Sequence, residues 1–303
     1  MSTSTAQAWT ALQELLGALA GQYRDDFRQA VVAAGLAREP VGMLLHAGDI
    51  DPRPLTAADL LECVPYYSAA SFTLPLQHLA AGGWLEQSGG GYRLTTRGRA
   101  ATDAMYGAAR NKLASLAPLP AADLERLADL LRRLLAGCQS SRVVTCQACL
   151  AASGSNVPWQ EPTPMATIAR VIEGLTNFRC DAHRAAWRPT DLDGPCWETL
   201  TWLWEGRADT AASLHAWSEK QPHPRALSAG DYAACLATLV EHGWAAATPA
   251  GCFALTAAGR AMRLAVEDQT NANFYGPWLV LSTAELDELT ARARAVLNGL
   301  KST

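Results

Sequence analysis

Four residues of the chain have the types and the spacing of a tetrahedral metal site. Cys146 and Cys149 lie three positions apart, and Cys180 and His183 follow with the same spacing. Thiolate and imidazole are ligands that Zn²⁺ takes in structural sites. The interval between the two pairs is longer than in a simple zinc finger. Zinc at these four residues therefore competes with two alternatives, a redox-active Cys146–Cys149 pair and inert cysteines.

A basic segment coincides with a glycine-rich stretch in the first third of the chain. Residues 82–100 read GGWLEQSGGGYRLTTRGRA, and Asp103 is the one acid among residues 93–112, which hold the basic residues. These basic residues are Arg93, Arg97, Arg99, Arg110 and Lys112. Such a patch binds nucleic acid by neutralising phosphates. A solvated helix face is the alternative.

Aromatic residues gather in the second half of the chain, where His183 and Trp187 are spaced by one helical turn. Arg179 and Asp181 can add polar groups beside them. Ligand pockets are mostly apolar, with a few convergent polar groups. Arg179, His183, Trp187 and Trp202 are therefore a candidate ligand pocket, with a packed core as the plainer alternative.

Composition limits the classes of function. The chain has 303 residues, 49% of them hydrophobic, and a net charge of −4. DNA binding would therefore depend on a local basic patch, because the chain as a whole is not basic. No apolar run reaches the roughly 20 residues that span a bilayer, and the N-terminus lacks the pattern of a signal peptide. We expect a cytoplasmic protein without a membrane partner.

The sequence contains no motif that indicates catalysis. It has no G-x-S-x-G turn, no phosphate-binding glycine loop and no H-E-x-x-H metal motif. Paired acids such as Asp25 and Asp26 are better explained as caps, turns or exposed charges. We expect a protein that is not an enzyme, with no catalytic residues and no cofactor unless zinc occupies the cysteines.

The glycine-rich stretch occurs a second time. Residues 242–263 read HGWAAATPAGCFALTAAGRAMR and repeat the Gly-Trp, the aromatic residue before Leu-Thr and the Gly-Arg-Ala of residues 82–100. The correspondence extends to APLPAADLERL at 117–127 and LVLSTAELDEL at 279–289. The two copies are about 155 to 162 residues apart, which is far longer than the roughly 20–50 residues of solenoid repeats. The sequence therefore predicts a duplicated domain.

Each copy is predicted to contain the same series of elements. Apolar periodicity, capping residues and turn signals indicate a long helix, three shorter helices, a hairpin and two further helices. In the first copy these lie at 6–35, 39–47, 55–63, 68–81, 84–95, 96–115 and 121–136. In the second copy they lie at 165–188, 194–205, 209–220, 228–242, 244–255, 256–272 and 283–299. Domains at 1–137 and 165–303 are joined by a linker at 138–164, which contains serine, glycine and proline.

This series of elements resembles the winged helix-turn-helix regulators of the MarR type. The resemblance is carried by HLAAGGWLE, GYRLTTRGRA and LAPLPAADLERLADLLRRLL, and again by LVEHGW, FALTAAGRA and WLVLSTAELDELTARARAVL. It implies a mainly α fold with small β-wings, in which two tandem winged helix-turn-helix domains pack through long terminal helices in a pseudo-two-fold arrangement. MarR chains dimerise through these helices. This chain is then a monomer with an internal pseudo-dimer, or a homodimer.

The resemblance also implies which residues contact double-stranded DNA. The third helix of such a unit enters the major groove and the wing contacts the backbone. In the first copy these elements offer Ser68, Ser71, Thr73, Gln77, His78, Arg93, Arg97 and Arg99. Pro75 is expected within the first turn of its helix, where no amide donor is lost.

The second copy lacks most of these groups. Its third helix contains acids but no lysine or arginine, and its wing AAATPAGCFALT carries no charge. Ala254 and Ala258 stand where the first copy has Arg93 and Arg97. We therefore predict a DNA-binding transcriptional regulator that contacts DNA mainly through the first copy, with a small-molecule effector as a second candidate partner. The alternative is a ligand sensor, redox sensor or protein-interaction module that keeps the winged-helix shape without binding DNA.

Overall fold

The protein is mainly helical and contains two small antiparallel sheets of two strands each. The computed structural model describes residues 3–37, 39–152, 163–221 and 225–301. This architecture confirms the predicted fold class. No helix within the described ranges is long and apolar enough to cross a membrane.

The first half of the chain contains every element predicted for it. These are α1 (Thr3–Ala33), α2 (Val41–Ile50), α3 (Ala57–Cys63), α4 (Ala70–Ala81), β1 (Leu85–Ser88), β2 (Gly91–Leu94), α5 (Thr96–Ala114) and α6 (Ala121–Gln139). Strands β1 and β2 pair from Leu85 opposite Leu94 to Ser88 opposite Gly91.

The second half repeats this order of elements, with two short 3-10 helices added. It contains α8 (Pro164–Trp187), η1 (Arg188–Thr190), α9 (Gly194–Trp204), α10 (Ala211–Glu219), α11 (Ala229–Glu241), β3 (Ala245–Ala247), β4 (Phe253–Leu255), α12 (Ala257–Tyr275), η2 (Gly276–Val280) and α13 (Thr283–Lys301). Helix α7 (Ala148–Ala151) lies within the predicted linker at 138–164. Residues 153–162 of that linker lie outside the described residues.

A tight joint connects α4, the first hairpin and α5. Gly83 has a φ of +73°, which favours glycine. The Thr95 hydroxyl caps α5 by accepting the backbone N–H of Gly98 at 3.0 Å, and it donates to the Gly83 carbonyl at 2.8 Å. A Cβ atom on Gly98 would overlap the carbonyl oxygen of Trp84. Glycine is therefore required where α5 crosses the hairpin.

The second half builds the same joint from the matching residues. Gly243 has a φ of +70°. Thr256 accepts the N–H of Gly259 at 3.1 Å and donates to the Gly243 carbonyl at 2.7 Å. A Cβ atom on Gly259 would overlap the Trp244 carbonyl. The Gly-Trp and Thr-x-x-Gly pairs that recur in the sequence thus form the same turn twice.

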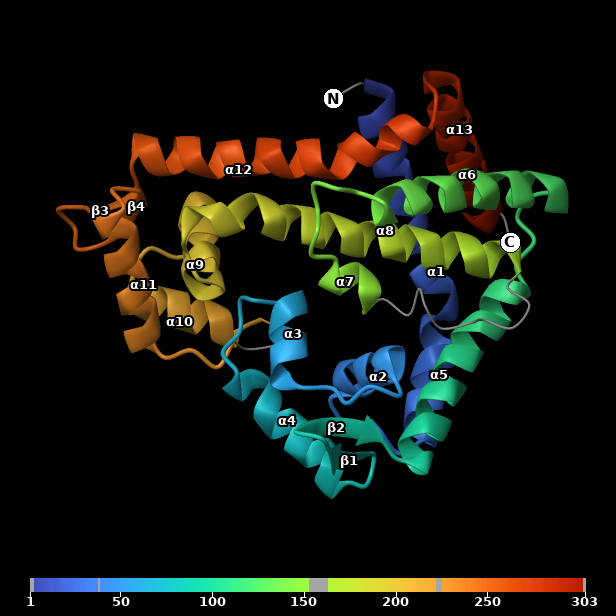
Figure 1. The fold of residues 1–303 in the computed structure, drawn as a ribbon, viewed down its shortest axis with the longest axis horizontal. Coiled ribbons are helices and arrows are strands. Elements are labelled where there is room, and N and C mark those ends of the chain that lie inside the picture. Colours follow the sequence, from blue (N-terminus) through green and yellow to red (C-terminus); the bar gives the residue numbers. More distant parts are fainter. Residues whose placement is uncertain (1–2, 38, 153–162, 222–224, 302–303) are drawn as a thin grey trace.

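One apolar core joins the two halves. Buried side chains from α1, α6, α8 and α13 form most of it, and the ends of α5 and α12 complete it. Figure 1 shows α6 and α13 at the upper right, where they meet α8 and the upper part of α1, and it shows the two hairpins at the periphery of the molecule. The ring of Trp9 packs edge-on against Phe274 and Trp278 of the second half, with centroids 4.8 and 6.3 Å away. The long terminal helices therefore pack as one body.

Each helix-turn-helix unit also has a smaller core of its own. In the first half, Phe72, Leu76 and Leu79 of α4 are buried against α2 and the hairpin. In the second half, Tyr232 and Leu236 of α11 pack in a cluster with Trp202 and Leu214. These cores fix which face of α4 and of α11 points outward.

The glycine at the joint provides a test of this packing. Gly98→Ala is expected to destabilise the protein, because its methyl group would meet the Trp84 carbonyl, and overpacking of this kind costs about 1–3 kcal/mol. Gly107→Ala, in the same helix but with its nearest neighbouring atom 3.9 Å away, is the matched control. It is expected to stabilise by up to about 1 kcal/mol through helix propensity. Urea denaturation followed by circular dichroism measures both, and equal midpoints would contradict the close approach.

Candidate nucleic-acid interface

Helix α4 occupies the position of the recognition helix in a helix-turn-helix unit, because it follows α3 and a short turn. It begins at Ala70, and Pro75 lies inside it rather than in its first turn, so the expected place of this proline is wrong. The proline ring removes one backbone donor from the helix. The helix continues nevertheless because three side chains on one face are buried in the core, namely Phe72, Leu76 and Leu79.

Both serines that are predicted to contact DNA, Ser68 and Ser71, face the second half of the chain. Ser68 donates its backbone N–H to the carbonyl oxygen of Arg225 at 3.2 Å. Ser71 donates its hydroxyl to the same oxygen at 2.6 Å, and the two serine hydroxyls lie 3.3 Å apart. The N-terminal part of a recognition helix is the part that contacts base edges. In α4 the two serines of this part bind the second half, whereas Ala70 and Thr73 stay exposed.

The side chain of Arg225 extends the same contact. It donates to both carboxylate oxygens of Glu198, with nitrogen–oxygen distances of 2.8 and 3.0 Å, and to the hydroxyl of Tyr67 at 2.5 Å. The arginine side chain is 15% exposed and the glutamate 10%. Burial raises the pKa of Glu198, and the hydrogen bonds from Arg225 oppose that rise. We call the set of Tyr67, Ser68, Ser71, Glu198 and Arg225 the seam.

The contact between the two halves extends from the seam to the start of α9, where backbone atoms pack closely. A Cβ atom on Gly194 would overlap the carbonyl oxygen of Pro65, in the turn between α3 and α4. Tyr66 of the same turn packs at a tilt against Trp187, with ring centroids 6.5 Å apart. The helix-turn-helix turn of the first half is thus enclosed by the second half.

The middle of α4 stays exposed. Thr73, Gln77 and His78 lie on its outer face, next to Leu74, which is 67% exposed. The Thr73 hydroxyl donates back to the carbonyl of Ala69 at 3.0 Å, and His78 Nε2 lies 2.8 Å from a carboxylate oxygen of Glu39. Gln77 makes no side-chain hydrogen bond within the described residues. This exposed face is polar in part and carries no lysine or arginine.

The three arginines of the first hairpin region differ in how they are held. The Arg97 guanidinium lies 3.5 Å from the centre of the Trp84 ring and donates to the Gly82 carbonyl at 2.8 Å. Arg99 donates twice to Asp51, which raises the pKa of Arg99. Arg93 is exposed on β2, and its side chain has no hydrogen bond or ion pair among the described residues. Arg93 is therefore the wing arginine most available to a phosphate.

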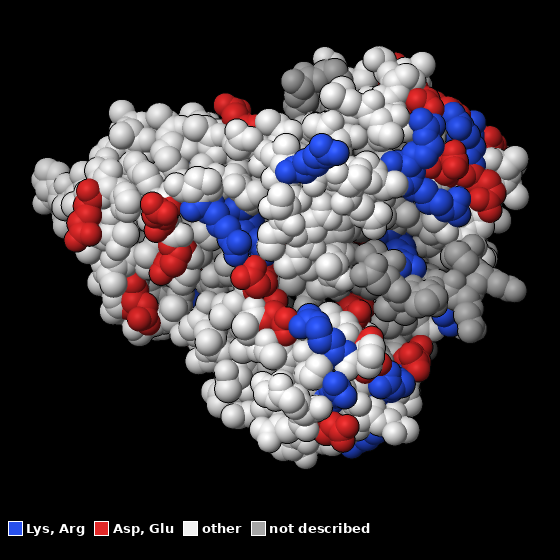
Figure 2. All heavy atoms as spheres, viewed as in Figure 1, with Lys and Arg blue, Asp and Glu red and all other residues white. Residues whose placement is uncertain are grey.

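The second unit presents fewer basic groups. Helix α11 is capped by Ser228 with Asp231, and its first turn is acidic. Its hairpin exposes Ala246 and Ala254 where the first exposes Glu86 and Arg93. Figure 2 shows acidic residues with few basic ones along the left part of the molecule, where α11 and the β3–β4 hairpin lie in Figure 1. In the same view, the densest basic cluster lies at the upper right and is intermixed with acids.

His183 of the candidate zinc set lies in the core. Its Nδ1 is 3.0 Å from the Thr270 hydroxyl, and its Nε2 accepts the indole N–H of Trp197 at 3.2 Å. Burial lowers the pKa of His183 to about 4, so the ring is neutral. Both ring nitrogens are thus hydrogen-bonded, and neither is turned toward Cys146, Cys149 or Cys180.

The cysteines of this set contact other groups instead. The Cys149 thiol donates to the carbonyl of Cys63 at 3.3 Å, and the guanidinium of Arg184 donates to the sulfur of Cys146 at 3.3 Å. A hydrogen bond from Cys149 and the nearby His46 lower the pKa of Cys63 to about 5. Cys180 is exposed on α8. Sequence reasoning missed Cys63, because its partners come from segments far away in the chain.

The four residues of the candidate ligand pocket have different surroundings. Arg179 pairs with Glu267 at 2.9 Å. Trp187 is buried and stacks on the ring of Trp197, whereas Trp202 belongs to a separate cluster under α11. A ligand pocket formed by these residues stays a prediction.

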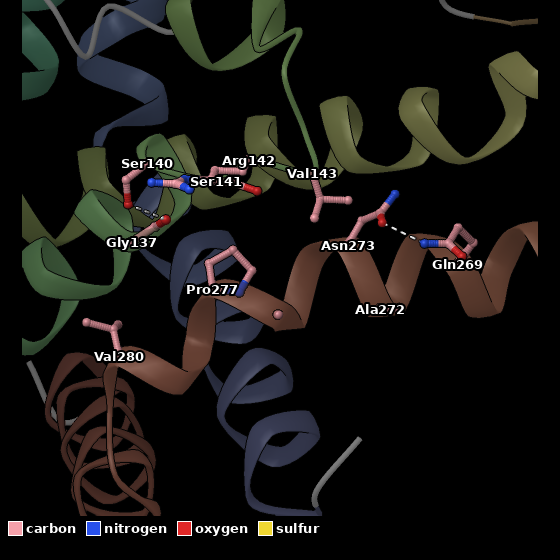
Figure 3. Close-up of a pocket in the computed structure, with 11 residues that line it drawn as sticks. Gly137, Ser140, Ser141, Arg142, Val143, Gln269, Ala272, Asn273, Pro277 and Val280 are labelled. Carbon is pink, nitrogen blue, oxygen red and sulfur yellow. Dashed lines mark hydrogen bonds between the residues drawn. The ribbon is translucent and has the colours of Figure 1, made fainter.

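A different pocket lies where the two halves meet. It has a volume of about 610 Å³ and is lined by the end of α6 and residues 140–143 on one side, and by α12 and η2 on the other. Figure 3 shows Val143 beside Asn273, whereas Arg142 lies next to Ser140 and Ser141. The Gln269 amide donates to Asn273 at 2.7 Å, and the Asn273 amide donates to the carbonyl of Ala182 at 3.2 Å. The volume is in the range of small-molecule sites, about 300–1,000 Å³.

The shifted pKa of Cys63 predicts unusual reactivity. Because a thiolate is the nucleophile and the pKa of Cys63 is lowered, alkylation of Cys63 by iodoacetamide should stay fast at pH values below the usual thiol range. Cys252 is the internal reference, because its hydrogen bond to Asp209 raises its pKa. Peptide mass spectrometry follows both rates across a pH series. A Cys63 rate that falls together with that of Cys252 would contradict the assignment.

Comparison with known proteins places the chain in a family. The model of a helix-turn-helix family matches residues 95–302, a span that contains the whole second unit and begins after the first hairpin. No curated protein and no solved structure gives a significant match. The helix-turn-helix is in general a DNA-binding unit of transcriptional regulators. Because the match covers more than half of its residues, the protein belongs to this helix-turn-helix family.

Proposed function

We propose that the protein is a transcriptional regulator of the MarR-like winged-helix type that contacts double-stranded DNA mainly through its first unit. The observation that carries this proposal is Arg93, an exposed arginine without a partner in the described structure, on the hairpin beside α4. The exposed Thr73 and Gln77 of α4 lie at the same end of the molecule (Figure 1). A wing that contacts phosphates next to a helix that contacts the groove is the arrangement such units use.

A tandem duplication explains why one chain has two such units. The support is the joint that recurs atom for atom at Gly83, Trp84, Thr95 and Gly98 and at their counterparts 160 or 161 positions later. The domains are then 1–137 and 165–303 with a linker at 138–164, and the shared core of terminal helices replaces the dimer interface of two chains. A covalent link keeps the effective concentration of each half for the other high. The proposed species is a monomer with an internal pseudo-dimer.

The seam sets a condition on this function. Ser68 and Ser71 donate to the carbonyl of Arg225, so these two groups at the start of α4 are occupied. Thr73, Gln77 and Arg93 can contact DNA with the seam closed, whereas base reading by the start of α4 requires it to open. DNA affinity is then reduced by the fraction of molecules in the closed state.

A small-molecule sensor is the second candidate, and the pocket in Figure 3 favours it. The pocket lies between the end of α6 and α12, so a ligand there would contact both halves. A protein that senses a ligand without contacting DNA would bind no duplex, even at low salt. The DNA titration below therefore separates the two functions.

Removal of the wing charge tests the DNA contact. Binding of a random-sequence duplex pool is measured at several salt concentrations, where each neutralised phosphate contributes about 0.9 to the slope of log affinity against log salt. Arg93→Ala is expected to weaken binding and to lower the magnitude of the slope by about 1. Arg260→Ala removes an exposed arginine of the second unit and is the matched control, with no expected change. Equal losses in both variants would contradict the asymmetry, and no binding by the unmodified protein would sink the regulator proposal.

Opening of the seam is expected to tighten DNA binding. Tyr67→Phe removes the hydrogen bond from Arg225, worth about 0.5–1.5 kcal/mol, and so raises affinity up to about tenfold if the closed state predominates. Glu198→Gln removes the carboxylate that pairs with the buried Arg225 and should act more strongly. Thr238→Ala, which removes a hydroxyl on α11 bonded only to its own helix, is the control. Circular dichroism verifies that each variant is folded. Weaker binding in folded Tyr67→Phe would contradict an inhibitory seam.

A further inference from the structure

Two buried cysteines of the second unit lie with their sulfur atoms in contact. Cys196 is in the first turn of α9 and Cys235 is in the middle of α11. Their Sγ atoms are 2.6 Å apart, and the residues are only 6% and 5% exposed. Sulfur atoms that are not bonded to one another stay farther apart than this. The distance approaches the roughly 2.05 Å of a disulfide bond.

We propose that Cys196 and Cys235 form a redox site, a dithiol that a hydroperoxide oxidises to a disulfide. The sulfur of one thiol attacks the peroxide while its proton passes to the Asp193 carboxylate, the O–O bond breaks, and a sulfenic acid forms as the proton leaves with the released water or alcohol. The sulfur of the second thiol then attacks the sulfenic sulfur, the S–O bond breaks, and the hydroxyl leaves as water with the proton of the second thiol. Two electrons pass from the two sulfurs to the peroxide. The product links α9 covalently to α11.

Asp193 gives this pair a route to solvent. It precedes α9 and caps it, accepting the backbone N–H of Cys196 at 2.8 Å. Its side chain is exposed, and one of its carboxylate oxygens lies within 4.8 Å of both sulfurs. The carboxylate is therefore placed to accept a thiol proton at the surface, where a small peroxide arrives.

The same three groups are also a candidate set of metal ligands, and the sulfur distance decides between the two chemistries. Zinc–sulfur bonds are about 2.3 Å long, and a tetrahedral angle between two of them places the sulfurs about 3.8 Å apart. The observed 2.6 Å is far shorter than that. Among the described residues, no fourth histidine, cysteine or carboxylate lies with these three. The geometry therefore favours a bond between the sulfurs.

The disulfide would act on the seam. Cys196 lies between Gly194, which packs on the Pro65 carbonyl, and Glu198, which binds Arg225. A covalent tie from this turn to α11 restricts the movement of α9 away from the first unit. The bond itself does not depend on the proposed function, whereas any effect of oxidation on DNA affinity rests on it.

Peptide mapping tests the proposal. Reduced full-length protein is freed of reductant, treated with an equimolar amount of hydrogen peroxide, denatured, alkylated with iodoacetamide and digested. We expect a linked peptide pair containing Cys196 and Cys235, with a mass two hydrogens below the sum of the free peptides. Cys196→Ser and Cys235→Ser should each abolish the linked pair. Cys138→Ser, which removes a buried cysteine of α6, should retain it.

Two results would overturn the proposal. In the first, both cysteines are fully alkylated after peroxide treatment in a protein that circular dichroism shows to be folded. In the second, elemental analysis finds one zinc per chain and both thiols resist peroxide until a chelator removes the metal. Amide hydrogen exchange provides a second readout, because oxidation should slow exchange over α9 and α11 in the unmodified protein and leave Cys196→Ser unchanged.

Discussion

The buried ion pair of Glu198 and Arg225 is the interaction on which the arrangement of the two units depends. Both side chains are largely withdrawn from water, and the guanidinium also lies 4.3 Å from the centre of the Tyr67 ring. A buried pair adds little net stability, but removing one partner costs about 3–5 kcal/mol because the other charge is left buried and unpaired. The pair therefore selects one arrangement. The Arg225 carbonyl binds Ser68 and Ser71, so that arrangement also decides which part of α4 reaches solvent.

The two units share their joints but not their surfaces. Gly98 and Gly259 allow the same crossing of helix and hairpin, because a side chain at either position would meet a tryptophan carbonyl. The exposed wing positions are free of this constraint, and one unit has Arg93 where the other has Ala254. The family match begins at Thr95 and so covers the unit with fewer basic groups. A chain of this kind can keep one unit for contact with DNA and use the other to cover it.

The elements and their joints were predictable because their causes are local. Thr95 and Thr256 each precede a helix with glycine at its third position, and helical periodicity marks the apolar faces. The environment of the site residues was not predictable, since it comes from distant segments. Ser71 meets Arg225 across 154 positions and Arg99 meets Asp51 across 48, so groups that looked free for phosphate are occupied. Pro75 was placed wrongly because buried neighbours on one face of α4 outweigh one missing amide donor.

Amide hydrogen exchange of the full-length protein, with and without a duplex selected from a random pool, tests the central claim most directly. The account predicts that DNA slows exchange in α4 and in the β1–β2 hairpin, while α11 and the β3–β4 hairpin exchange at unchanged rates. Protection confined to the second unit, or equal in both, would contradict an asymmetric contact through the first unit.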